Sequence, residues 1–478
     1  RRQRQMCIRD RLCIASGFLL VGQGWSSRAP FASDLLFRMS LSIGFGLGIF
    51  SVVLFVWRAI GVGSLVALDL VIFALLLGGF LLCRPRGVAS VRQEVDGPAW
   101  LRRILTVAFA TALCATLYSD ILRMLVHPHG DGWDAFAIWN LHARFLFRGG
   151  LHWRDGFTTL IPWSHPDYPF LLPAAIAHFW TYLGHDDPHI PDTISLLFTF
   201  GTVGLLVSAL SLLRGRAAAM LGGLTLLTTP FFIEQGAAQY ADIPLSFFIL
   251  ATLALLCADD EDSHHGLTSH RCLVLAGLAV GFAAWTKNEG LLFLGAALAA
   301  RLLLLIRRHL NPAPSQPRRE CWLDLTAVLA GVAPVFLVIA WFKHSVAPPG
   351  DLFSDPATML QKILTPARYW AVMQWYAKGF LRFGNWLWIP CPLLLIAWYL
   401  AAGNEKDGQT GPGFRSSLLA LVLTLTGYFA VYVITPYDIY WHLRFSLPRL
   451  FLQLWPGSVF LFFVALPPKV LGRTRSGV

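Results

Sequence analysis

Long apolar runs recur along the chain and are separated by short polar or charged stretches. A helix needs ~20 mainly apolar residues to cross the hydrocarbon core of a bilayer, and most of these runs approach that length. Repeated runs of this kind predict an all-α polytopic membrane protein. We expect about twelve transmembrane helices, at roughly 39–57, 62–83, 104–126, 193–213, 217–233, 243–258, 272–286, 290–306, 325–342, 386–401, 416–435 and 450–466.

One further apolar segment, 168–184, is short and begins with prolines. The charges decide its assignment. With twelve spans and both termini inside, the Arg-rich segments 1–38 and 84–103 face the cytoplasm, as the positive-inside rule requires. With thirteen spans, the acidic segment 185–192 would be cytoplasmic instead. We therefore expect 168–184 to be a re-entrant or juxtamembrane helix, in which His178 is a satisfied polar group.

The composition supports the same class, because 56% of the residues are hydrophobic and 14% are charged, against ~25% charged in soluble domains. It excludes a water-soluble core. The formal charge of +11 fits Lys and Arg in cytoplasmic loops better than a nucleic-acid partner. None of the eight cysteines falls well inside an external loop, so we expect no disulfide framework. Residues 5–11 resemble translated adapter sequence, and we assign no function to the first dozen residues.

An acidic stretch opens the first long external loop, from Gly130 to Gly149. Its two carboxylates, Asp131 and Asp134, directly precede a pattern that turns helical and amphipathic. We expect this helix to lie along the membrane surface, with its aromatic residues in the lipid and its Arg residues at the headgroups. Two acids at the mouth of a membrane protein suggest a functional site.

The same topology brings other polar side chains to the external side. Some lie in the first loop, some at short turns between helices, and some in a late polar stretch. They are His165 and Asp167, then Asp242, then Lys287 and Glu289, and finally Trp441, His442 and Arg449.

Five short motifs on this side, taken in order, resemble the GT-C membrane glycosyltransferases. These enzymes use polyprenyl-phosphate sugars and include protein O-mannosyltransferases (glycosyltransferase family 39) and bacterial aminoarabinose transferases. The resemblance runs from about Leu101 to Pro467. In one respect the chain departs from the family, whose first loop commonly holds an Asp-Glu pair, because Asp134 is flanked by Trp133 and Ala135. The motifs are Gly132-Trp-Asp-Ala135, His165-Pro-Asp-Tyr-Pro-Phe-Leu-Leu-Pro173, Gln239-Tyr-Ala-Asp-Ile-Pro-Leu-Ser-Phe-Phe248, Trp285-Thr-Lys-Asn-Glu-Gly290 and Trp441-His-Leu-Arg-Phe-Ser-Leu-Pro-Arg449.

The resemblance implies a domain organisation. Residues 101–467 would form a GT-C-like catalytic domain whose long first external loop contains juxtamembrane helices. Residues 39–100 would add two accessory transmembrane helices and a cytoplasmic loop. Residues 1–38 and 468–478 would be cytoplasmic ends.

The resemblance also implies sugar transfer from a lipid phosphate to a hydroxyl, with inversion at the anomeric carbon. An acceptor hydroxyl needs a general base, for which Asp134 is the first candidate and Asp131 the second. A phosphate leaving group needs cations as its charge develops, and Lys287 and Arg449 are candidates. Asp242 could bind sugar, acceptor or a cation. The remaining substrate-binding candidates are His165, Asp167, Glu289, Trp441 and His442.

Partners and location follow from the same comparison. The donor would be a lipid-linked sugar, and the acceptor a glycan, a lipid or a protein. The protein would reside in a bacterial inner membrane, with its active site facing the periplasm or exterior. The sequence identifies no cofactor with certainty, and a divalent metal held by carboxylates from two loops is an open alternative.

Most of the candidate residues also have a purely structural interpretation. Asp134 and Asp242 suit helix N-termini, whereas Lys287 and Arg449 suit the ends of membrane helices. The others could be loop formers, namely Asp131, His165 and Asp167, or interfacial anchors, namely Trp441 and His442. At the level of function, the alternatives are a transporter or lipid flippase and a structural membrane component. A transporter usually places its charges at mid-membrane and often shows internal repeats, whereas here the acids cluster at one face.

Overall fold

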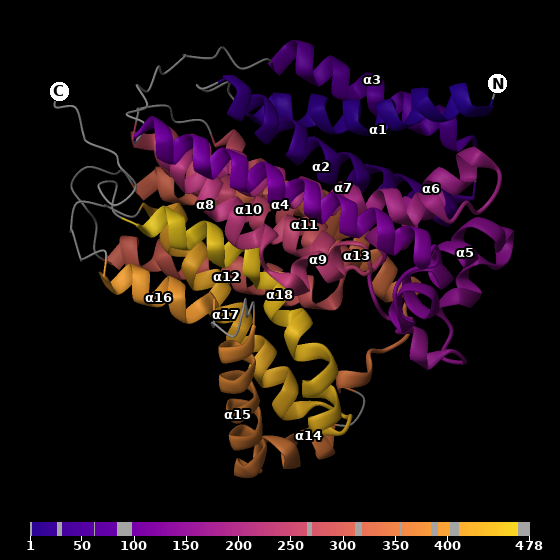
Figure 1. Cartoon of the computed structure of the whole chain (residues 1–478). Helices are drawn as coiled ribbons and strands as arrows, with labels where there is room; N and C mark the ends of the chain where they lie inside the picture. The colour runs from indigo at the N-terminus through magenta and orange to yellow at the C-terminus, as the bar shows by residue number, and fades with distance from the viewer. Residues whose placement is uncertain are drawn as a thin grey trace.

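The computed structural model describes residues 2–25, 31–61, 63–83, 98–264, 270–310, 318–353, 356–383, 391–401 and 411–466. These residues form helices and connecting loops, and no β-strand occurs among them. The long helices lie side by side in one bundle (Figure 1). The expected all-α polytopic class is therefore confirmed.

Nine helices in the described ranges are long and apolar enough to cross a membrane. They correspond to nine of the expected spans, and most extend beyond the predicted boundaries. They are α2 (Phe31–Ile60), α3 (Leu65–Cys83), α4 (Ala99–Val126), α7 (His189–Arg214), α10 (Asp242–His264), α12 (Asn288–Leu310), α13 (Arg318–Ser345), α17 (Pro412–Ile434) and α18 (Ile439–Ala465).

The expected span at 217–233 is not one straight helix. It is divided into α8 (Arg216–Leu227) and α9 (Pro230–Gly236), which are bent by 72° relative to each other. The break falls at Pro230, whose ring removes a backbone donor and disfavours helical backbone at the residue before it. Thr229 is accordingly extended. The segment expected as one span is therefore two helices joined by a sharp bend.

Two other expected spans are short helices. Span 272–286 is α11 (Arg271–Thr286), with 16 residues. Span 386–401 is represented by α16 (Cys391–Ala401), and its first residues lie outside the described ranges. The close packing of α11 against α13 depends on two glycines, since a Cβ at Gly277 or Gly331 would lie 2.0 Å from a carbonyl oxygen of the other helix. Small residues allow such backbone approach between membrane helices.

Residues 1–38, expected to be a cytoplasmic segment, include helical structure. Helix α1 (Arg2–Gly24) packs lengthwise against α2, which itself begins at Phe31. The two helices approach closely at Gly17 and Gly46, where a Cβ would meet carbonyl oxygens at 2.0 and 2.3 Å. Polar and small residues interrupt the apolar run of α1, which is why hydropathy alone did not identify it. Helix α1 begins at the end of the bundle where α5 lies (Figure 1).

The first long loop folds into a chain of short helices. They are the π-helical η1 (Ala135–Trp139), α5 (Asn140–Arg148), the 3₁₀ helices η2 (Gly150–Phe157) and η3 (Pro162–Ser164), and α6 (Leu171–Leu183). The amphipathic helix expected at the membrane surface is instead packed on protein, because Trp139 and Leu146 are fully buried against the bundle. Phe136 alone among its large apolar residues is strongly exposed.

Helix α6 is too short to cross a bilayer, as the charge pattern predicted for 168–184. Its residues 171–180 are all buried, and it packs against α2 and α5. His178 is a satisfied polar group, with one ring nitrogen 2.9 Å from the Phe50 carbonyl oxygen and the other 3.0 Å from Asp69. The expectation for this histidine is confirmed.

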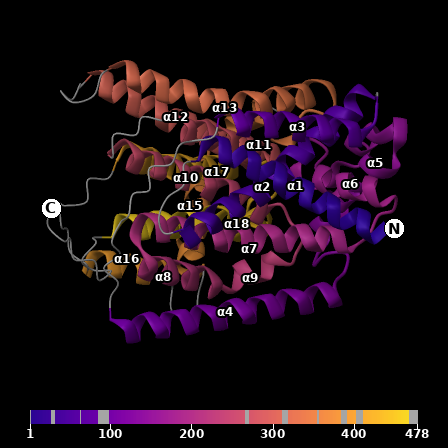
Figure 2. The ribbon, with the colours of Figure 1, turned by 90° about the horizontal axis from the view of Figure 1, so that it is seen from above.

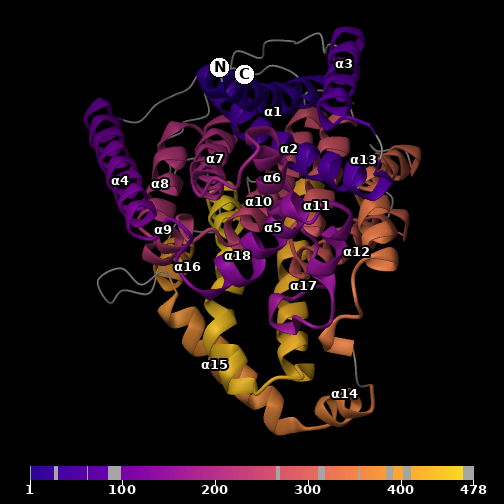
Figure 3. The same cartoon turned by 90° about the vertical axis from the view of Figure 1, so that its right-hand side faces the viewer.

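The region between α13 and α17 forms η4 (Asp351–Phe353), α14 (Pro356–Ile363) and α15 (Pro366–Arg382). Helices α14 and α15, with the adjoining ends of α17 and α18, project from the bundle (Figure 3). An aromatic cluster connects α2, the residue before α6, α11 and α13. In it, the Phe170 ring lies 5.2 Å from Phe55, 4.7 Å from Trp285 and 4.7 Å from Phe342. This cluster supports the turn at which Lys287 lies.

Candidate functional site

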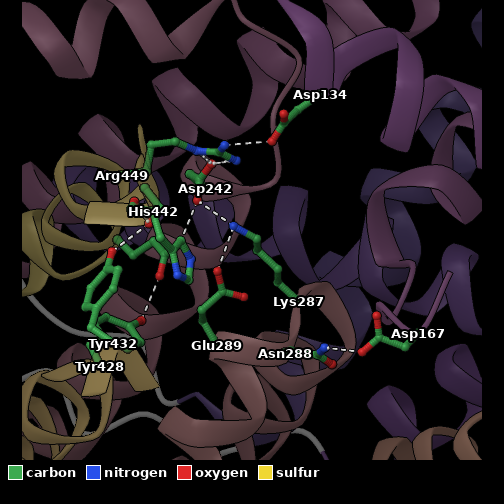
Figure 4. Close-up of polar contacts among 12 residues, drawn as sticks. Asp134, Asp167, Asp242, Lys287, Asn288, Glu289, Tyr428, Tyr432, His442 and Arg449 are labelled. Carbon is green, nitrogen blue, oxygen red and sulfur yellow. Dashed lines mark hydrogen bonds and ion pairs between the residues drawn. The ribbon is translucent and has the colours of Figure 1, made fainter. Parts of the chain in front are cut away.

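Five charged side chains from separate elements meet at one place (Figure 4). Asp134 lies just before η1, and Asp242 is the first residue of α10. Lys287 lies between α11 and α12, Glu289 is in the first turn of α12, and Arg449 comes from α18. We call these five residues the charged cluster. Their order in the chain gives no hint of how closely they meet, but all five are among the residues that the sequence analysis selected.

Arg449 joins the two aspartates of the charged cluster. Its Nη1 donates to Asp134 Oδ2 at 2.6 Å, and its Nε donates to Asp242 Oδ2 at 2.8 Å. Its Nη2 lies 2.7 Å from the same Asp242 oxygen. The guanidinium also lies 4.7 Å from the ring centroid of Tyr240, a cation–π contact. The planar fork of Arg is what allows one side chain to hold two carboxylates at once.

Asp242 is the buried centre of the charged cluster, with no exposed surface. Its Oδ1 accepts hydrogen bonds from Gln453 Nε2 at 2.5 Å and from Lys287 Nζ at 3.1 Å. Tyr428 in turn donates to Gln453 Oε1 at 2.7 Å. A buried carboxylate is tolerated only with such partners, so these contacts fix Asp242 in place.

Lys287 is shared between Asp242 and Glu289, with its Nζ 2.8 Å from Glu289 Oε1. Burial alone would lower the pKa of Lys287, but the two carboxylates outweigh it and raise that pKa. Lys287 therefore stays charged. The turn that carries it needs Gly290, because a Cβ there would lie 1.8 Å from the Ala283 carbonyl oxygen.

The cluster has a buried side and an accessible side. The side chain of Asp134 is 22% exposed, whereas those of Asp242 and Lys287 are 0% and 5% exposed. Arg449 and Glu289 are also partly accessible. Within the described ranges, Asp134 Oδ1 accepts no hydrogen bond, so this oxygen is available to a bound molecule.

Two predicted residues of the first loop flank the charged cluster. Asp167 Oδ2 accepts a 2.7 Å hydrogen bond from Asn288, the residue between Lys287 and Glu289. His165 stacks on Tyr168 at 4.7 Å, and burial lowers the pKa of His165. The Tyr168 ring lies 5.9 Å from Lys287 Nζ. These side chains shape the wall of the site rather than its charged centre.

Two predicted residues, Asp131 and Trp441, lie apart from the charged cluster. Asp131 pairs with Arg123 at 2.9 Å, at the end of α4. Trp441 is 55% exposed and packs on Tyr437 and Phe445. His442, two turns before Arg449 on α18, lies beside the charged cluster (Figure 4), and its Nδ1 is 2.8 Å from the Thr435 hydroxyl.

The helix-cap interpretation of Asp134 does not fit the structure. Its backbone is already helical, at φ −63° and ψ −31°, and its side chain makes no capping hydrogen bond. The carboxylate points instead to Arg449 (Figure 4). Asp134 is therefore held in the site by a side chain 315 positions away in the chain.

Sequence reasoning missed several residues that support the site. Gln453 and Tyr428 complete the surroundings of Asp242, and Tyr240 lies beneath Arg449. A signal for Gln453 was present, because an amide in an apolar helix, four residues after Arg449, faces the same side. The signal for Tyr240 was weaker, because it was only the position of Tyr240 two residues before Asp242. The hydropathy pattern gave no signal for Tyr428.

A second network behind the site was also missed. Asn140 Nδ2 donates to Gln239 Oε1 at 2.7 Å, and Gln239 Nε2 donates to Asp192 Oδ1 at 2.5 Å. Gln239 is buried with φ +60°, a conformation that non-glycine residues rarely adopt. Such strain persists where surrounding contacts enforce it. Gln239 thus ties the helix after Asp134 to the loop before Asp242.

In the described parts of the chain, no group of three or more His, Cys, Asp or Glu side chains is placed to hold a metal ion. The position between Asp134 and Asp242 is filled by the guanidinium of Arg449. The arrangement suits a reaction in which one carboxylate takes a proton and one fixed cation meets developing negative charge.

Comparison with known proteins gives one match. The family dolichyl-phosphate-mannose-protein mannosyltransferase matches residues 164–341, a part of the chain that includes Asp167, Asp242, Lys287 and Glu289. No curated protein and no solved structure matches the chain. The match supports the resemblance to GT-C membrane glycosyltransferases inferred from the sequence.

Proposed function

We propose that the protein transfers a sugar from a polyprenyl-phosphate donor to a hydroxyl on a glycan, lipid or protein acceptor. The reaction would take place at the end of the bundle that carries the charged cluster. By the positive-inside rule, this end would face the periplasm or exterior of a bacterial inner membrane. The transferred group would be a hexose or a pentose.

The observation that carries this proposal is the position of Arg449 between an accessible and a buried aspartate. A general base must reach the acceptor, and Asp134 has an accessible oxygen that accepts no hydrogen bond within the described residues. A phosphate leaving group needs a cation beside it. Arg449 is the more accessible of the two cluster cations, since Lys287 is buried between two carboxylates.

The proposed reaction is a direct displacement. The acceptor oxygen attacks the anomeric carbon while Asp134 Oδ1 takes the hydroxyl proton. The bond from that carbon to the donor phosphate breaks, and its electron pair remains on the phosphate oxygen. Arg449 stabilises the new charge, which requires no strong acid because a phosphate leaves as an anion. Attack from the side opposite the leaving group inverts the anomeric configuration.

Asp242 has a supporting task in this scheme. Its two oxygens hold Arg449 on one side and Lys287 on the other. Because Asp242 is buried and fully engaged, it orients Arg449 and does not serve as the base. The roles assigned to Asp242 and Lys287 from the sequence thereby become positioning roles.

The proposal is tested by transfer assays with purified protein in proteoliposomes. The donors would be a panel of radiolabelled undecaprenyl-phosphate hexoses and pentoses, offered with lipid, glycan and peptide acceptors. The proposal expects label on one acceptor class, with the product anomer opposite to that of the donor. Movement of labelled lipid across the membrane without transfer to any acceptor would contradict it and would support a flippase.

A further inference from the structure

Helix α3 is attached to the rest of the protein by few buried side chains. It lies beside α1 on the outside of the bundle (Figure 2). Of its residues 65–82, only Leu65 and Asp69 are buried. Asp69 is thus the one buried polar residue of this segment, and its side chain is 1% exposed. A carboxyl group buried in a membrane helix needs a specific partner.

The partner of Asp69 is His178, near the middle of α6. His178 Nε2 lies 3.0 Å from Asp69 Oδ2, and His178 Nδ1 lies 2.9 Å from the Phe50 carbonyl oxygen of α2. The side chain of His178 has no exposed surface. Both hydrogen bonds are therefore shielded from water, and together they join α3, α6 and α2.

The two hydrogen bonds of His178 determine how many protons the pair holds. A carbonyl oxygen can only accept, so Nδ1 must carry a hydrogen and donate it to Phe50. The contact between Nε2 and Asp69 then needs a second proton, because a bare ring nitrogen and an ionised carboxylate can both only accept. The pair therefore holds one proton more than a neutral histidine and an ionised aspartate hold together.

The other oxygen of Asp69 indicates where this proton lies. Asp69 Oδ1 is buried and has no hydrogen-bond partner among the described residues. A buried carboxylate oxygen without a partner is costly when the group is ionised. A protonated Asp69 that donates from Oδ2 to His178 Nε2 leaves both side chains uncharged, and this form agrees best with the surroundings.

Neighbouring charges do not supply an alternative partner. Across the side chains that the structure describes on α1, α2, α5, α7 and α11, none forms an ion pair with Asp69 or His178. The titratable side chain in ring contact with His178 is Tyr182 of the same helix, at 5.0 Å. The proton between the pair is therefore what makes the contact between α3 and α6 favourable.

We propose that the proton shared by Asp69 and His178 acts as a latch that fastens α3 to α6. When it is lost to water, two acceptors face each other at 3.0 Å in a buried place, and α3 loosens. The docked state binds one proton more than the separated pair, so its stability falls as the pH rises. Because α6 begins four residues after Asp167, the latch connects α3 to the wall of the candidate site.

The test is equilibrium unfolding of the purified full-length protein by SDS in mixed micelles, at pH 7 and at pH 8. The main variant is Asp69→Asn, whose amide donates to Nε2 as the protonated carboxyl does but has no proton to lose. The second variant combines Asp69→Leu with His178→Phe, which replaces the pair by apolar groups of similar size. The control is Asp155→Asn, since the Asp155 side chain is 67% exposed in η2.

We expect the unfolding equilibrium constant of the wild type to rise about five- to tenfold more between pH 7 and pH 8 than that of Asp69→Asn. The reason is that the unfolded chain releases this proton above ~6.5, the ordinary pKa of histidine, whereas the docked pair requires it. The double variant should behave like Asp69→Asn, and it decides the outcome if Asp69→Asn does not fold. Asp155→Asn should respond to pH like the wild type.

Three results would overturn the proposal. Equal pH responses of the wild type and Asp69→Asn would show that the folded pair holds no extra proton. A wild type that gains stability relative to Asp69→Asn as the pH rises would show an ionised Asp69 without the shared proton. An effect of Asp155→Asn as large as that of Asp69→Asn would assign the pH response to the general charge of the protein.

Discussion

Arg449 is the residue on which the account of the site depends. Among the described residues, it is the only one that forms ion pairs with both Asp134 and Asp242. Its two tasks need a planar group with several donors in fixed directions, and Lys cannot supply that geometry. A positive charge at position 449 is therefore not sufficient to hold both aspartates.

Replacing Arg449 by Lys should lower kcat of sugar transfer by ~10²-fold, because one ammonium cannot hold both aspartates and meet the phosphate. The measurement is steady-state transfer at saturating donor. Arg444→Lys is the control, since Arg444 is exposed on the same helix. Comparable loss in both variants would show a general effect on α18 rather than a role at the site.

The sequence selected all five residues of the charged cluster, because polar side chains are few in an apolar chain and topology placed them on one side. Their pairing could not be predicted. Whether Arg449 meets a phosphate, a lipid headgroup or a carboxylate depends on distances between helices that periodicity does not determine. Asp131 shows the limit of predicting such pairs from the sequence. It lies three residues from Asp134, yet it pairs with Arg123 instead of Arg449.

At the scale of elements, Gln239 connects three helices. Its amide accepts from Asn140, at the start of α5, and donates to Asp192, in the first turn of α7. Gln239 itself precedes α10, which carries Asp242. This explains how a long loop can hold Asp134 at a fixed distance from Asp242.

Gln239→Leu keeps the side-chain size but removes both hydrogen bonds, and leaves buried Asn140 and Asp192 groups unpaired. We expect a loss of stability of about 2–4 kcal/mol and a fall in kcat with little change in KM for the donor. Thermal unfolding and transfer kinetics measure the two effects. An unchanged kcat in folded variant protein would remove Gln239 from the positioning network.

His142 in α5 gives the loop a dependence on pH. Burial, with a contribution from His165, lowers the pKa of His142 to about 3, against ~6.5 in an unfolded chain. The folded state therefore keeps His142 neutral, and its protonation favours unfolding as the pH falls below ~6.5.

His142→Phe removes this titration while retaining a ring to stack on Phe157. Between pH 7.5 and pH 5, the wild type should lose about 2 kcal/mol more stability than the variant. Unfolding temperatures at the two pH values measure the difference. Parallel decreases in both proteins would show that His142 does not titrate on unfolding.

At the scale of the whole molecule, the sequence predicted the fold class and most of the long helices, because length and hydropathy are local properties. The sequence did not predict the features that depend on packing between helices. Helix α1, whose apolar run is interrupted by polar residues, is held in the bundle by close contact with α2. The loop helix that was expected at the lipid surface instead packs on protein, with Trp139 buried. The bend between α8 and α9 had a local cause at Pro230, but its 72° angle did not follow from the sequence.

The proposed sidedness of the bundle can be measured directly. Leu160 is strongly exposed in the first loop, and His309 is exposed near the end of α12. A cysteine at position 160 should react with a membrane-impermeant maleimide on intact cells, whereas one at position 309 should react only after the inner membrane is opened. The reverse pattern would place the charged cluster in the cytoplasm.

The most direct test of the central claim compares Asp134→Asn with Asp131→Asn in the same transfer assay. Asparagine preserves the shape of each side chain and its hydrogen bond from Arg449 or Arg123, but it cannot take a proton. We predict that Asp134→Asn lowers kcat by at least ~10²-fold, as loss of a general base does, while Asp131→Asn transfers like the wild type. Wild-type activity in Asp134→Asn would contradict the assignment of Asp134 as the base, and with it the proposed chemistry of the charged cluster.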